Sequence, residues 1–185
     1  MKVIKFLLIV FITLISLVKA DSVNEISQKL KKEGYLIFIR HAYAPGGGDP
    51  NTFNLDDCST QRNLSNSGRI QAEKIGSFFK NNFIPIDLVI SSEWCRCKET
   101  ASISFKNFIT KNFLNSFYSK KFASNKDQQM KDLKDYIKNW DGKKNLVFIT
   151  HYVVIAEVLN YAPSSGEIVI SDKNLKVIET INIGY

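Results

Sequence analysis

The sequence predicts an α/β layered fold, in which helices cover a sheet that is at least partly parallel. Two observations predict this class. Apolar runs of strand length alternate with longer stretches whose apolar residues recur at helical spacing. The first three runs are apolar at almost every position, which is typical of strands covered on both faces. Ligands of such sheets bind beyond the carboxyl ends of the strands, so reactive residues are expected there.

Strands and helices are expected to alternate along most of the chain. The expected strands are residues 35–39, 87–91, 145–150, 166–171 and 176–183. The expected helices are residues 64–82, 95–108, 126–140 and 151–161. Ser65 or Asn66 is the expected N-cap of the first helix, because a short polar side chain there accepts a hydrogen bond from a free backbone amide. The last helix is expected to stop before Pro163.

Residues 1–20 are expected to be a signal peptide, followed by a single domain at residues 21–185. Two lysines precede an apolar run from Phe6 to Val18, and small or apolar residues then stand where a signal peptidase reads. The run is shorter than the about 20 residues that a membrane-spanning helix needs. We therefore expect a periplasmic or secreted protein without stable membrane insertion after cleavage. An uncleaved membrane anchor is the alternative.

The charge pattern argues against a nucleic-acid partner. The formal charge is +7, and without the three lysines of the expected signal peptide it is +4. The remaining lysines are scattered and form no basic stripe interleaved with aromatic residues. A solvated basic surface is the expected result, and the oligomeric state stays open.

The three cysteines permit one disulfide in an exported chain and leave one thiol. Cys95 and Cys97 flank Arg96 and should point in different directions, so they are not expected to pair with each other. We expect Cys58 to pair with one of them, and we favour Cys95. The rival interpretation, a zinc site, lacks the usual spacing of the ligands.

Reactive side chains follow three of the expected strands. Arg40 and His41 follow the first strand, Arg96 follows the second, and His151 follows the third. Both histidines of the chain are thus expected at one edge of the sheet. Guanidinium groups stay protonated and offer only donors, so they do not bind metals. Two arginines beside two imidazoles therefore predict a pocket for a dianionic oxyanion, most simply phosphate.

These residues resemble the histidine phosphatase superfamily, the group that includes phosphoglycerate mutases, acid phosphatases and phytases. The resemblance rests on four segments in the family's order, namely RHA (40–42), RNLSNSGRIQA (62–72), SSEWCRCKETA (91–101) and THYVV (150–154). It implies a three-layer α/β/α sandwich around a mainly parallel sheet with some antiparallel content.

The resemblance also implies roles for the matching residues. His41 would be the nucleophile that becomes phosphorylated, and Arg40, Arg96 and His151 would complete the phosphate pocket. An unprotonated imidazole is a competent nucleophile. The arginines and a protonated His151 would stabilise the charge that develops around phosphorus. Water would then hydrolyse the phosphohistidine, so neither a metal nor another cofactor is expected.

Residues 44–65 form the longest irregular stretch and follow the expected nucleophile directly, so they are expected to line the pocket. Their three consecutive glycines would present backbone amides to a phosphate or would form a plain flexible loop. Arg62 is expected to contact the phosphate or the substrate. A salt bridge from Arg62 to Asp56 or Asp57 is the alternative.

The chain departs from the family mainly at the proton donor. Ala42 replaces the usual glycine, which is a minor change. The mutase-like branch has a glutamate acid where this chain has Ser116, and the acid phosphatase branch has an aspartate where it has Tyr152. Candidates for a substitute are Asp49, Asp56, Asp57 and Asp127, followed by Glu157 and Glu167. Without an acid, the reaction would be restricted to good leaving groups such as phosphohistidine, phosphoanhydrides and aryl phosphates.

The sequence thus predicts an exported, metal-independent phosphatase acting through a phosphohistidine on a small or envelope-linked phosphate ester, for instance a phosphate of a lipopolysaccharide core. The alternative is a phosphate- or phosphoglycan-binding module that kept the pocket and lost turnover. A phosphotransferase or mutase is a third hypothesis, which export disfavours because the phosphorylated sugars of central metabolism are cytosolic.

Overall fold

A computed structural model describes residues 25–32 and 34–185. The expected signal peptide, residues 1–20, lies outside the described residues. Within the described part, none of the helices combines the length and the apolar character that crossing a bilayer requires.

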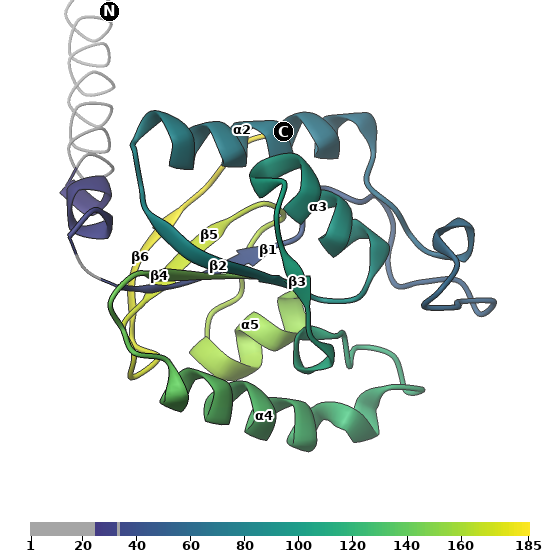
Figure 1. The fold of residues 1–185 in the computed structure, drawn as a ribbon. Coiled ribbons are helices and arrows are strands. Elements are labelled where there is room, and N and C mark those ends of the chain that lie inside the picture. The colour runs from purple at the N-terminus through teal and green to yellow at the C-terminus, as the bar shows by residue number, and fades with distance from the viewer. Residues whose placement is uncertain (1–24, 33) are drawn as a thin grey trace, which may run out of the picture.

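Six strands form one mixed, mostly parallel sheet in the order β3-β2-β4-β1-β5-β6 (Figure 1). The strands are β1 (Leu36–Arg40), β2 (Ile86–Ser91), β3 (Ile109–Thr110), β4 (Asn145–Thr150), β5 (Ile168–Ser171) and β6 (Val177–Ile181). The first four strands pair in parallel, whereas β5 runs antiparallel to both β1 and β6. The five expected strands are all present. The structure adds β3, which has only two residues. A strand of this length is too short to give a recognisable apolar pattern in the sequence.

Two helices cover each face of the sheet, as expected of a three-layer sandwich (Figure 1). The helices are α2 (Asn66–Asn81), α3 (Cys95–Phe105), α4 (Lys126–Asn139) and α5 (Tyr152–Leu159). Helices α2 and α3 lie on one face, and α4 and α5 lie on the other. Ser65 is the N-cap of α2, and its hydroxyl accepts a hydrogen bond from the amide of Gly68. Helix α3 ends three residues earlier than expected, where Lys106 adopts a positive φ of 67°.

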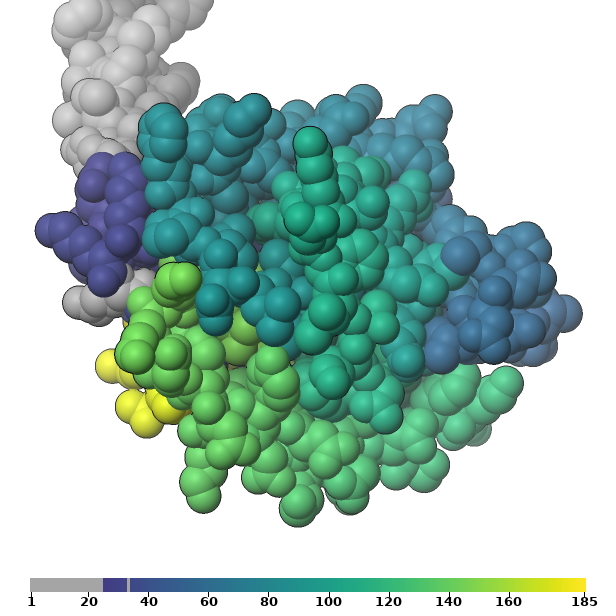
Figure 2. Space-filling model, viewed as in Figure 1, coloured from purple at the N-terminus to yellow at the C-terminus, as the bar shows by residue number. Residues whose placement is uncertain are grey.

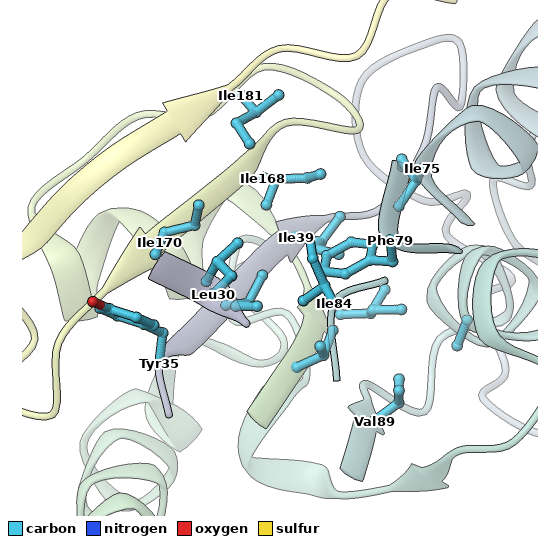
Figure 3. Close-up of a cluster of buried hydrophobic side chains, with 14 of the residues drawn as sticks. Leu30, Tyr35, Ile39, Ile75, Phe79, Ile84, Val89, Ile168, Ile170 and Ile181 are labelled. Atoms are coloured by element: carbon cyan, nitrogen blue, oxygen red, sulfur yellow. The ribbon is translucent and has the colours of Figure 1, made fainter. Parts of the chain in front are cut away.

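The strand side chains divide the core into two layers. Ile37 and Ile39 of β1 belong to the cluster under α2 and α3, whereas Leu36 and Phe38 belong to the cluster under α4 and α5. All four are fully buried. Burying one such side chain stabilises a fold by about 1.5–3 kcal/mol. Figure 3 shows part of the first cluster, in which Ile39 lies next to the side chain of Phe79 from α2. Packing on both faces makes β1 a rigid support for the residues that follow it.

The register of the central strands brings their carboxyl ends to one edge of the sheet. Arg40 of β1 is paired with Thr150 of β4. The pairing continues one residue further, because the amide of His41 donates to the carbonyl of Thr150 at 2.9 Å. On the other side of β4, the amide of Ser92 donates to the carbonyl of Ile149 at 2.9 Å. The segments that follow β1, β4 and β2 therefore start side by side.

A disulfide joins Cys58 to Cys95, as the sequence analysis favoured. It ties the long loop after β1 to the first residue of α3. Cys97 is free and buried. Burial raises the pKa of the Cys97 thiol to about 12, so this thiol stays protonated and is a poor nucleophile for disulfide exchange.

Loss of the disulfide should lower the stability of the fold. Removing a cross-link between residues 37 positions apart is expected to lower the free energy of unfolding by about 4 kcal/mol, because the unfolded chain gains loop entropy. Urea denaturation of Cys58→Ser measures the loss, and the reduced native protein serves as the matched control. Equal stability of the oxidised and reduced native protein would contradict the pairing.

Candidate active site

His41 lies directly beyond β1 and is 2% exposed. Its Nδ1 lies 2.8 Å from the carbonyl oxygen of Ala42. Because a carbonyl only accepts, Nδ1 carries the proton and Nε2 holds the free lone pair. The Nε of Arg96 donates to this Nε2 at 3.2 Å, which agrees with the same tautomer. The imidazole is thus held with the nitrogen that can attack phosphorus unprotonated.

The buried guanidinium of Arg96 connects both histidines with a carboxylate. Arg96 is the second residue of α3 and is 3% exposed. Its Nη1 donates to Oδ1 of Asp49 at 2.7 Å, and its Nη2 donates to Oδ2 at 3.2 Å. The same Nη2 lies 3.4 Å from Nδ1 of His151. The planar guanidinium of Arg96 therefore fixes the two imidazoles and the carboxylate of Asp49 relative to one another.

His151 carries its proton on the nitrogen opposite to Arg96. Its Nε2 lies 2.9 Å from the hydroxyl of Ser92, which donates in turn to Oδ1 of Asn115 at 3.0 Å. The hydroxyl therefore accepts from Nε2, and Nδ1 faces Arg96 with its lone pair. His151 is thus neutral in this structure, and its expected role as a protonated donor to a bound phosphoryl group stays a prediction.

Burial is the main cause of the low basicity of both imidazoles. It lowers the pKa of His41 well below the ordinary value of 6.5, and the charge of Arg96 lowers that pKa further. Burial and the charges of Arg96 and His41 also lower the pKa of His151. A bound dianion would favour the protonated form and would raise the pKa of His151 again.

The four residues expected to form the phosphate pocket line one cavity of about 460 Å³. Residues of the loop after β1 and of the segment 116–122 complete its wall. These two wall segments lie next to each other at one side of the molecule, where Figure 2 shows the loop in blue and the other segment in green. The structure thus brings Arg40, His41, Arg96 and His151 together, and their catalytic roles remain predictions.

Residues 36–117 match the family model described as the histidine phosphatase superfamily, branch 1. Over this segment the chain is similar to the histidine phosphatase superfamily. The matched segment contains Arg40, His41, Arg62 and Arg96 and ends before His151. A comparison with curated proteins by sequence finds no significant match.

Several solved structures share the fold of this chain. A chain from Agrobacterium tumefaciens named as the phosphohistidine phosphatase SixA is 15% identical, with a TM-score of 0.58, over 82% of this chain and 99% of that one. The protein histidine phosphatase SixA complexed with tungstate is 13% identical, with a TM-score of 0.55, over 80% and 96%. A phosphoglycerate mutase from Thermus thermophilus is 13% identical, with a TM-score of 0.54, over 80% and 98%. At these identities the likeness establishes the fold.

The other two arginines that line the cavity, Arg40 and Arg62, differ in how they are held. Nη1 of Arg40 donates to the carbonyl of Pro163 at 2.9 Å, while its Nε is buried without a partner among the described residues. Arg62 donates through Nε to the carbonyl of Gly48 at 3.1 Å and through Nη1 to the carbonyl of Ala44. The alternative of a salt bridge from Arg62 to Asp56 or Asp57 is wrong, because its guanidinium holds loop carbonyls instead.

Asp49 lines the cavity as an ionised carboxylate. Besides Arg96, it accepts hydrogen bonds from the amide of Arg62 at 3.0 Å and from Nε1 of Trp94 at 3.1 Å. Burial acts to raise the pKa of Asp49, but the hydrogen bonds and charge of Arg96 outweigh it, and the net pKa is lowered. A general acid needs a raised pKa, so this environment does not suit Asp49 for that role.

The other candidate acids lie away from the cavity. Asp57 caps a short 3-10 turn by accepting from the amide of Ser59, and Asp56 is on the same exposed loop. Glu167 accepts from the hydroxyl of Tyr161 at 2.5 Å. The two remaining candidates, Asp127 and Glu157, line a separate depression at helix α4. Among the described residues that line the cavity, Asp49 is therefore the only carboxylate.

The residues that orient the motif residues leave no signal in the sequence. The hydroxyl oxygen of Thr100 accepts a hydrogen bond from the amide of Ala42 at 3.1 Å. This bond fixes the backbone directly after His41. A Cβ on Gly68 would lie 2.0 Å from the carbonyl oxygen of Tyr43, so only glycine allows α2 to approach this backbone so closely. The segments RNLSNSGRIQA and CRCKETA contain these residues, but their contacts depend on the packing of α2 and α3.

The buried neutral histidines should make stability depend on pH. Both folded-state pKa values lie below the ordinary 6.5, so unfolding takes up protons as the pH falls. The stabilisation present above pH 6.5 is therefore lost toward pH 5. Urea denaturation between pH 7.5 and 5 in phosphate-free buffer measures it. The variant His41→Gln/His151→Gln lacks every histidine of the chain and should show a flatter profile. An equal slope in both proteins would contradict the assignment.

Removing the charge of Asp49 should destabilise the fold. Asp49→Asn leaves the guanidinium of Arg96 buried without its counter-ion, and we expect a loss of about 3 kcal/mol in the free energy of unfolding. Asp57→Asn is the matched control, because asparagine caps a helical turn as well as aspartate does, and its change should stay below about 1 kcal/mol. Equal losses in the two variants would argue against the buried ion pair.

Proposed function

We propose that the chain is an exported phosphatase in which His41 takes the phosphoryl group of a substrate and water then releases it. The observation that carries this proposal is the tautomer of His41. Its Nδ1 proton is held by the carbonyl of Ala42, and its Nε2 lone pair lies beside the fork of Arg96 at the cavity. This arrangement prepares a nucleophile for phosphoryl transfer without a proton transfer before attack.

The first step would transfer the phosphoryl group to the histidine. Arg40 and Arg96 would hold the phosphoryl oxygens, and Nε2 of His41 would attack phosphorus in line with the leaving group. The N–P bond forms as the bond to the leaving group breaks, and the leaving group takes the electron pair. The Nε of Arg96, which donates to Nε2 of His41 before the reaction, would then donate to a phosphoryl oxygen, where negative charge develops.

The second step would return the enzyme to its initial state. A water molecule attacks the phosphorus of phosphohistidine, the N–P bond breaks, and its electron pair returns to Nε2 of His41. The proton of the water passes to phosphate or solvent. Throughout both steps, Nδ1 of His41 keeps its proton and donates it in a hydrogen bond to the carbonyl oxygen of Ala42, which stabilises the positive charge of the phosphorylated ring.

The cavity favours substrates with good leaving groups. Its single carboxylate, Asp49, is ionised and bound to Arg96, so no described side chain replaces the general acid of the family. The leaving groups of phosphohistidine, phosphoanhydrides and aryl phosphates depart without such an acid. The two SixA structures carry the names phosphohistidine phosphatase and protein histidine phosphatase, and these names agree with this restriction. We retain a small or envelope-linked phosphate compound as the proposed substrate class.

Export is part of this proposal and rests on two features. The first is the expected signal peptide at residues 1–20. The second is the disulfide between Cys58 and Cys95, because disulfides persist mainly in oxidising compartments such as the periplasm. Processing of the chain to residues 21–185 would be visible as the mass of the mature protein.

The second candidate function is a phosphate- or phosphoglycan-binding module. One observation favours it: Asp49 occupies both Nη atoms of Arg96, so an incoming phosphate must compete with a carboxylate already in place. Against it stands the oriented lone pair of His41, because binding alone does not require a nucleophilic tautomer.

Replacing the nucleophile should abolish turnover. With 4-nitrophenyl phosphate as substrate and a chelator present, His41→Ala is expected to lose at least about a thousand-fold in kcat. Activity of the native protein should persist below pH 6.5, because the lowered pKa keeps His41 unprotonated there. Rate measurements from pH 4 to 8 check both points. No turnover in either protein, together with binding of vanadate, would leave the binding module as the function.

A further inference from the structure

The cavity holds more positive charge than one phosphoryl group requires. Among the described residues that line it, five are cationic, namely Arg40, Arg62, Arg96, Lys120 and Lys121, and one, Asp49, is a carboxylate. Asp49 is bound to Arg96. A phosphomonoester brings at most two negative charges, so the two lysines have no counter-charge in the simple phosphatase model.

The two lysines lie on a segment that is anchored to the site. Phe122, the next residue along the chain, packs with its ring centroid 5.4 Å from that of Trp94 and 5.5 Å from that of Phe53. Trp94 in turn lies 5.3 Å from the ring of His151. This aromatic cluster fixes the backbone at residues 120–122 beside the cavity, so the lysines are held at its rim.

The rim lysines are not neutralised by a carboxylate, in contrast to two lysines of the nearby helix α4. Lys126 and Lys131 each form an ion pair, at 2.8 and 2.9 Å respectively. Neither Lys120 nor Lys121 forms an ion pair with any carboxylate of the described chain. Lys121 lies 5.4 Å from the ring centroid of Phe122. A surface lysine without an ion pair is ordinary by itself, but here two of them line the cavity that contains the histidines.

Ser116 also leaves the cavity with an excess of positive charge. It lines the cavity and is 8% exposed, at the position where the mutase-like branch has its glutamate. A carboxylate there would repel a second anion and would offset one of the lysines. With serine, the field of this wall stays positive and favours anionic ligands.

We propose that Lys120 and Lys121 bind a second anionic group of the substrate, next to the phosphoryl group that His41 receives. The substrate class is then a small molecule with a good leaving group and two neighbouring anionic groups, such as a phosphoanhydride or an aryl phosphate that carries a carboxylate. This inference rests on the proposed function, and it names the substrate class of the same site.

The second anion site also addresses the missing acid. In a phosphoanhydride, the bond from Nε2 of His41 to phosphorus forms while the bridging P–O bond breaks. The departing phosphate takes the electron pair and needs no proton at that moment. The ammonium groups of Lys120 and Lys121 stabilise the charge that develops on it, which is the contribution that a general acid makes for an alkoxide.

Three stable phosphonates test the site without turnover. Methylphosphonate carries one anionic group, methylenediphosphonate carries a second phosphonate, and phosphonoacetate carries a carboxylate instead. Dissociation constants are measured by calorimetry on the purified full chain at about 150 mM salt, which screens distant charges. The native protein should bind methylenediphosphonate at least about 10-fold more tightly than methylphosphonate. The phosphonoacetate result decides between phosphate and carboxylate as the second group.

The variant Lys120→Ala/Lys121→Ala should lose most of this preference and keep its affinity for methylphosphonate within about 2-fold. Lys143→Ala/Lys144→Ala is the matched control, because it removes the same charge from exposed residues outside the cavity. The proposal is overturned if the preference survives in the first variant, or if the control loses it equally.

The two proposals can fail separately. Binding of methylphosphonate without turnover of 4-nitrophenyl phosphate would remove the phosphatase function and leave the second anion site intact. Turnover in the native protein, with the same preference for methylenediphosphonate in native protein and lysine variant, would remove the second anion site alone.

Discussion

The buried guanidinium of Arg96 is the interaction on which the site depends. Its Nε faces His41, its Nη2 faces His151, and both Nη atoms bind the carboxylate of Asp49. A cation at 3% exposure is costly unless it is paired and hydrogen-bonded. The partners of Arg96 meet this requirement, and the same contacts fix the two imidazoles relative to each other. Stability and preorganisation of the site therefore have one physical origin.

The fold positions this guanidinium through contacts at both of its neighbours. Cys95 is bonded to Cys58 of the long loop, and its amide donates to the side chain of Gln61 at 2.9 Å. Cys97 is fully buried in the core cluster under α2 and α3. Arg96 is thus held between a covalent tether and the hydrophobic core, and it has little freedom to leave the histidines.

Charge distribution links the chemistry of the site to its substrate. Burial and Arg96 keep both imidazoles neutral, so the arginines and rim lysines supply the positive charge of the cavity. The only carboxylate among the described residues that line it neutralises Arg96 and does not donate a proton. The cavity therefore suits an anionic ligand whose leaving group departs unprotonated, and a second anion on that ligand complements Lys120 and Lys121.

The sequence by itself determined five of the six strands, helices α2 to α5 and the convergence of Arg40, His41, Arg96 and His151, because strand patterns and the rule on strand ends are local or topological. Only the tertiary structure decided the tautomers, the pairing of Asp49 with Arg96, and the place of Lys120 and Lys121 at the cavity. Asp49 is 47 residues from Arg96 in sequence, and irregular loops carry no periodic signal for such pairings. Their geometry follows from the burial of side chains around the loop, and burial is a property of the folded chain alone.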